Sequence, residues 1–138
     1  MPWTLSEIHP LFVHFPIALF STGLLFDVLA QLLNIDDLET AGFWIMLIAL
    51  VSSLFTIISG IIAFVQIGSF IDLLHFHHGL LQLTATLILF ILFTVRIQLQ
   101  IDFRYSILKR NIYFAFHIIA VCILLYSSHL GAKAAERI

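Results

Sequence analysis

Apolar residues fill four long stretches of this chain, and short polar segments separate them. The stretches cover about residues 11–33, 43–67, 74–95 and 112–130. Each is close to the roughly 20 residues that an apolar helix needs to cross the hydrocarbon core of a bilayer. We therefore predict an all-α fold: a bundle of four transmembrane helices in up-down-up-down order. It forms a single membrane domain over residues 1–138, with both termini on the same side.

The longest polar segment, residues 96–111, has a different pattern. Between Ile97 and Tyr105, apolar residues occupy every second position and alternate with Gln98, Gln100, Asp102 and Arg104. A period of two is typical of an extended strand, here a strand or hairpin lying at the membrane interface. A frayed continuation of the third helix is the alternative.

Composition supports a membrane location. Hydrophobic residues make up 62% of the chain and charged residues only 10%, whereas a soluble domain is about half apolar and about a quarter charged. The lipid bilayer is therefore the expected environment. The formal net charge of −2 offers no basic surface for nucleic acid, and the single cysteine, Cys122, excludes a disulfide within the chain.

The basic residues predict the orientation of the bundle. Lys133 and Arg137 lie on the side of the termini, while the opposite side carries Arg96, Arg104, Lys109 and Arg110. Because lysine and arginine accumulate on the cytoplasmic side of membrane proteins, we expect the termini to be extracytoplasmic.

Histidines gather on that extracytoplasmic side. Six of the seven come from three separate segments: the first stretch begins with His9 and His14, the third with His75, His77 and His78, and the fourth ends at His129. Only His117 lies in the cytoplasmic half. Imidazoles at the edge of hydrocarbon are costly unless they are hydrogen-bonded or coordinate something, so this gathering points to a binding site.

Two imidazoles on facing transmembrane helices can hold haem iron from both sides. We assign His14 and His78 as the axial ligands of a haem b, with His75 as the substitute for His78. His9 and Gln82 would lie next to these histidine ligands and support them by hydrogen bonds. His9, His77 and His129 are otherwise interpreted as interfacial histidines bonded to backbone or water. A haem here suggests electron transfer, for instance from quinol, in which histidine also handles protons.

Two alternatives stay open. A compact cluster that includes His14 and His78 would suit zinc or copper, as a binding or transport protein, although only Glu7 and Asp72 are nearby carboxylates. The chain would otherwise be a non-catalytic accessory subunit of a larger membrane complex, or a homo-oligomer without a cofactor. In that case the small-residue stripe 52–63 and the segment 97–105 would be docking surfaces.

Asp27 is the only acidic residue inside the predicted spans. A carboxylate in hydrocarbon is expected to be paired or to face the bundle interior. A structural ion pair with Arg96 is the favoured interpretation, and a proton relay that includes His117 is the other. We find no convincing internal repeat, because the first and third stretches both begin with histidines but share no proline or glycine pattern.

The opening motif resembles that of a known family. The segment HPLFVHFPIAL, residues 9–19, together with Asp27 further along, is similar to the start of small bacterial four-span membrane proteins of unknown function. Those relatives also begin their third span with a histidine, and some are joined to cytochrome c-like or Rieske-type modules. The resemblance implies a redox function with such a partner in a bacterial inner membrane. The motif residues of the family match His9, His14, Pro16 and Asp27 of this chain.

Overall fold

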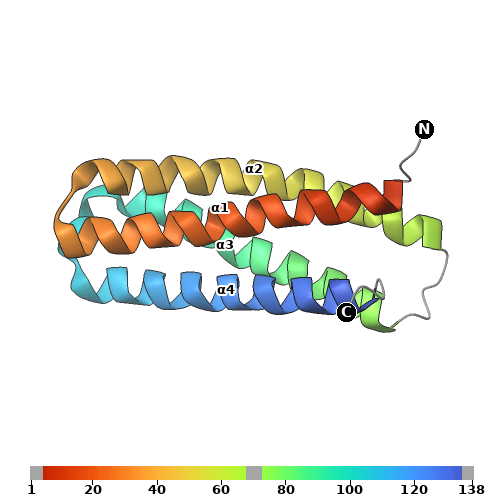
Figure 1. Cartoon of the computed structure of the whole chain (residues 1–138). Coiled ribbons are helices and arrows are strands. Elements are labelled where there is room, and N and C mark those ends of the chain that lie inside the picture. Colours follow the sequence, from red (N-terminus) through yellow and green to blue (C-terminus); the bar gives the residue numbers. More distant parts are fainter. Residues whose placement is uncertain (1–4, 68–72, 135–138) are drawn as a thin grey trace.

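Four long helices make up the described part of the chain. The structure, a computed structural model, describes the backbone of residues 5–67 and 73–134 and the side chains of residues 9, 12–65, 74–99 and 106–133. The helices are α1 (Leu5–Leu33), α2 (Asp36–Ile67), α3 (Leu73–Tyr105) and α4 (Ile107–Ala134). All four are long and apolar enough to cross a membrane. The predicted all-α transmembrane bundle is confirmed, and the start of α1 and the end of α4 lie at the same end of it (Figure 1).

The helices extend further than the apolar stretches. In particular, α3 continues through Tyr105 and α4 begins at Ile107, so the strand expected within residues 96–111 is wrong and the helical alternative is right. A strand there would have needed a partner for its backbone groups. Continuing an existing helix satisfies the same groups internally and requires no new nucleation.

The turn between α1 and α2 has clear local causes. Asn34 takes a left-handed backbone conformation with φ 55°, and the amide of Ile35 donates to the carbonyl of Ala30 at 3.1 Å. This is the Schellman ending of a helix. The first turn of α2 then carries Asp36, Asp37 and Glu39, whose negative charges favour a helix N-terminus.

The bundle is built from two hairpins. The most extensive packing lies within the pair α1–α2 and within the pair α3–α4. Their interior is mainly apolar but also buries polar side chains such as Asp27 and Arg96, and large exposed apolar side chains cover the outer surface, as lipid contact requires. The most deeply buried apolar residues, all at most 1% exposed, are Phe20, Met46, Ala49, Ala85, Leu89, Ala120 and Leu124.

A proline inside α1 explains one contact within the first hairpin. Pro16 has no N–H, so it leaves the carbonyl of Phe12 without its usual helical donor. Thr56 on α2 donates its hydroxyl to that carbonyl at 3.0 Å. The small polar stripe of α2 therefore faces α1, as expected for small residues in a membrane helix.

Candidate functional site

His9 on α1 and His78 on α3 lie close together at the end of the bundle where α1 begins. Their ring centroids are 6.3 Å apart and the rings are nearly perpendicular, with an interplanar angle of 73°. Both side chains are half-buried. The structure therefore brings together imidazoles from the two different hairpins.

Hydrogen bonds determine which nitrogen of each ring carries the proton. His78 Nδ1 lies 2.7 Å from the carbonyl oxygen of Ser127, which can only accept, so Nδ1 is the donor. His9 Nδ1 lies 2.9 Å from Ser59 Oγ, and that hydroxyl gives its own proton to the carbonyl of Thr56. Nδ1 of His9 is therefore also a donor. Both rings keep the lone pair of Nε2 available for a ligand.

Two glycines make room for these rings. A Cβ added at Gly60 on α2 would lie 3.0 Å from Cε1 of His9, and a Cβ added at Gly131 on α4 would lie 2.8 Å from Cε1 of His78. Gly79, by contrast, has open space around it. Each of the four helices thus contributes to the histidine site, two by an imidazole and two by a glycine.

The other residues expected at this site are placed differently. His14 is exposed, so the structure pairs His9, rather than His14, with His78. His75 is half-buried beside His78 in sequence, and Gln82 is buried, with its Oε1 3.4 Å from Ser127 Oγ. The side chains of Glu7 and Asp72 lie outside the described residues.

The sequence did hold a signal for His9. A helix has 3.6 residues per turn, so residues 18 apart lie on the same face after five turns. His9 is 18 residues before Asp27, which must face the bundle interior. His78 stands in the same relation to Arg96. His14, 13 residues before Asp27, falls toward the opposite side of α1.

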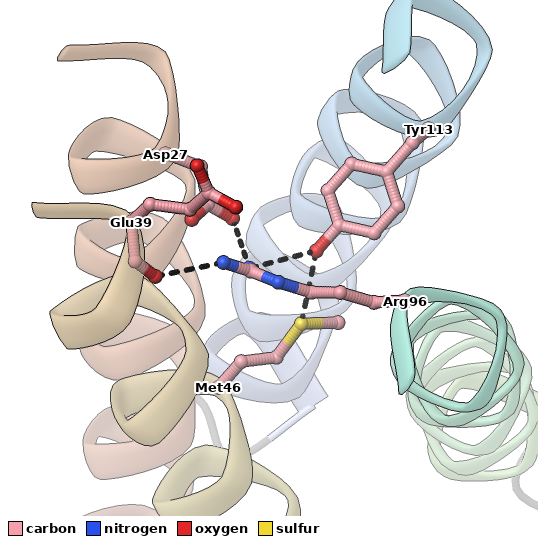
Figure 2. A network of polar contacts seen from close by, with 5 residues as sticks. All are labelled: Asp27, Glu39, Met46, Arg96 and Tyr113. Atoms are coloured by element: carbon pink, nitrogen blue, oxygen red, sulfur yellow. Dashed lines mark hydrogen bonds and ion pairs between the residues drawn. The ribbon is translucent and has the colours of Figure 1, made fainter. Parts of the chain in front are cut away.

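A charged network occupies the opposite end of the bundle (Figure 2). Arg96 on α3 donates from Nη1 to Asp27 Oδ2 at 2.5 Å and from Nη2 to the carbonyl of Glu39 at 2.8 Å. The hydroxyl of Tyr113 accepts from Arg96 at 3.4 Å and donates to Met46 Sδ at 3.2 Å. The expected pair of Asp27 and Arg96 is present, and the network joins all four helices.

Two groups near this network are buried without a hydrogen-bond partner among the described residues. They are Oδ1 of Asp27 and both ring nitrogens of His117. The ring of His117 packs edge-on against Tyr113, with centroids 5.7 Å apart. The main role of this charged network is therefore to join the four helices. At the opposite end, His9 and His78 each have an Nε2 that is available for a ligand.

These features define a multi-pass membrane protein of four helices with a histidine pair at one end. The chain belongs to the family described as "Predicted membrane protein (DUF2231)", which matches residues 6–138. Neither a curated protein nor a solved structure gives a significant match to the chain.

Proposed function

We propose that this protein binds a b-type haem between His9 and His78 and transfers electrons at the extracytoplasmic face of a bacterial inner membrane. The observation that carries the proposal is the pair of imidazoles from two hairpins, each with Nδ1 hydrogen-bonded and Nε2 available. When bound, haem would supply one-electron chemistry.

The spacing of the rings suits one metal held from two sides. His9 and His78 would be the two residues that hold the metal, each through the Nε2 that its Nδ1 hydrogen bond leaves available. Their ring centroids are 6.3 Å apart. Gly60 and Gly131, on the two remaining helices, leave the space that the rings occupy, because an added Cβ would lie 3.0 Å from the His9 ring and 2.8 Å from the His78 ring.

The donor set favours haem over zinc or copper. Structural zinc takes four protein ligands, and catalytic zinc takes three. Within the described residues, no group of three or more histidine, cysteine, aspartate or glutamate side chains could hold a metal ion. Two imidazoles complete the coordination of haem iron, since the porphyrin supplies the other four nitrogens.

The position of the site suggests its partners. His9 precedes the span that begins at Phe12, and His78 lies in the first turns of the span that begins at Leu74, so the site is close to the aqueous boundary. An electron carrier at this depth can reach a soluble partner on the extracytoplasmic side, such as a cytochrome c-like or Rieske-type protein. A quinol in the lipid is the proposed electron donor.

An optical spectrum of the purified protein tests the proposal. Reduced-minus-oxidised absorption should show a haem b band that His9→Ala and His78→Ala both abolish. His14→Ala, at an exposed position, is the matched control and should keep the band. Wild-type protein that remains free of haem after expression with added haem precursor would refute the proposal and favour an accessory subunit. Loss of the band only in His14→Ala would refute the ligand assignment.

A further inference from the structure

Most buried positions of the two hairpins of this chain correspond. Residues of α1 match residues of α3 after a shift of 69, and residues of α2 match residues of α4 after a shift of 71. Under the first shift, the buried positions that coincide are the pairs Val13/Gln82, Pro16/Ala85, Ile17/Thr86, Phe20/Leu89, Gly23/Leu92 and Asp27/Arg96. Under the second, they are Gly42/Tyr113, Met46/His117, Ala49/Ala120, Leu50/Val121, Ser53/Leu124 and Thr56/Ser127.

Helical periodicity alone does not explain this correspondence. Two amphipathic helices can be matched at several shifts that differ by whole turns. The shift of 69 is singled out because it also superposes His9 on His78 and Asp27 on Arg96. The starts of α2 and α4, at Asp36 and Ile107, also differ by 71, so the second shift agrees with where these two helices begin.

The histidine site obeys the same correspondence. The shift of 71 superposes Gly60 on Gly131, and each glycine lies against the imidazole of its own hairpin. Each imidazole also donates from Nδ1 within its own hairpin, His9 to the side-chain Oγ of Ser59 and His78 to the backbone carbonyl of Ser127. These two acceptors are not equivalent positions, because the shift of 71 matches Ser127 with Thr56 and Ser59 with Leu130. Both halves thus place one histidine and one glycine at equivalent positions, and the acceptor of the Nδ1 hydrogen bond differs between them.

We infer that the chain consists of two equivalent helical hairpins joined in tandem and related by a pseudo-two-fold axis along the bundle. The His9–His78 site lies on this axis, so each half would contribute one imidazole to its ligand. A planar metal complex with two open axial positions, which presents the same chemistry on both faces, is the class of ligand that fits. This statement about the ligand rests on the proposed haem function; the equivalence of the hairpins does not.

The ion pair shows how the two halves have diverged. In a dimer of identical hairpins, the positions of Asp27 and Arg96 would hold two like groups facing each other across the axis, and like charges there repel. In the joined chain the two positions hold opposite charges that bind each other. Each hairpin is therefore complementary to the other and not to a second copy of itself, which is a common use of buried polar pairs.

Distances between spin labels test the equivalence in the full chain. Leu25→Cys with the native Cys122 labels α1 and α4, and Thr94→Cys with Val51→Cys, in a Cys122→Ser background, labels the equivalent positions on α3 and α2. All four positions are exposed. Equal mean distances for the two pairs support the axis. Means that differ by more than a helical turn, about 5 Å, would overturn it.

Ligand binding separates this inference from the proposed function. If haem binds on the axis, His9→Ala and His78→Ala should lower haem content to the same extent, and free imidazole should restore it equally in both. Haem retained in one variant and lost in the other would overturn the symmetric site while leaving haem binding itself intact. Equal label distances in a protein without haem would uphold the duplicated architecture, and only the proposed function would fail.

Discussion

At the residue scale, the two glycines beside the histidines give the site its shape. Gly131→Ala would place a Cβ 2.8 Å from the His78 ring and should displace that ring from the Ser127 carbonyl. We expect lower haem affinity and a loss of about 1–3 kcal/mol in the free energy of unfolding. Gly79→Ala is the control, because open space surrounds Gly79 and alanine favours a helix by about 0.5–1 kcal/mol. Thermal unfolding in detergent measures the stability of both variants. Equal changes in stability for Gly131→Ala and Gly79→Ala would contradict the role given to Gly131.

The buried ion pair gives a second prediction at this scale. Arg96→Gln leaves the Asp27 carboxylate in the bundle interior without its cation, which we expect to cost about 3–5 kcal/mol of stability. The double variant Asp27→Asn with Arg96→Gln should lose less than the sum of the two single variants, because both charges are gone. Arg110→Gln is the control: Arg110 is only partly buried and bonds to Gln31, so its loss should cost about 0–1 kcal/mol. Strict additivity of the pair would argue against direct coupling.

His9 predicts a dependence on pH. Burial, and then the charge of His78, hold the pKa of His9 below its ordinary value of 6.5. Below pH 6.5 the unfolded chain therefore binds a proton more readily than the folded protein does, so folding stability decreases as pH falls through this range. Thermal unfolding of haem-free protein between pH ~7.5 and ~5.5 should show this decrease. It should be smaller in His9→Gln, and an unchanged slope in that variant would exclude His9 as the cause.

At the element scale, the contact between Thr56 and Phe12 depends on the proline in α1. Thr56→Val removes the only described side-chain donor to the Phe12 carbonyl, leaving it unsatisfied at a cost of about 1–3 kcal/mol. In a Pro16→Ala background, the amide of residue 16 can bond to the same carbonyl within the helix. Thr56→Val should therefore cost less in that background than in the wild type. A double-mutant cycle by chemical unfolding measures the difference, and equal costs in both backgrounds would contradict this account.

The helices themselves followed from the sequence, while their partners did not. Hydropathy gives four spans because each long apolar run must satisfy its backbone internally in lipid. The alternation at residues 97–105 led to the wrong prediction of a strand. A pattern of nine residues cannot show whether the preceding helix continues through it. Choosing between His9 and His14 requires knowing which face of α1 points into the bundle. Asp27 identifies that face, because a carboxylate inside the membrane must face a partner in the bundle interior. The correspondence of the hairpins was hidden because equivalent positions hold different residues, such as Met46 and His117.

At the scale of the whole molecule, the ion pair changes the charge balance that determines orientation. Arg96 is 5% exposed and bound to Asp27, so it contributes little to the positive charge at the membrane surface. The excess of positive charge at the turn between α3 and α4 then rests on Arg104, Lys109 and Arg110. The opposite end of the bundle carries Lys133 and Arg137. The positive-inside rule still predicts that the turn between α3 and α4 is cytoplasmic and that the histidine site is outside.

Cysteine labelling in intact cells tests this orientation. In a Cys122→Ser background, Lys133→Cys should react with a thiol reagent that cannot cross the membrane, whereas Lys109→Cys should react only after the membrane is opened. Both lysines are exposed in the bundle, so the side of the membrane decides their access to the reagent. The reverse result would put the histidine pair in the cytoplasm. The proposed redox partner would then have to be cytoplasmic, because the proposed electron exchange requires the partner to approach the end of the bundle that holds His9 and His78.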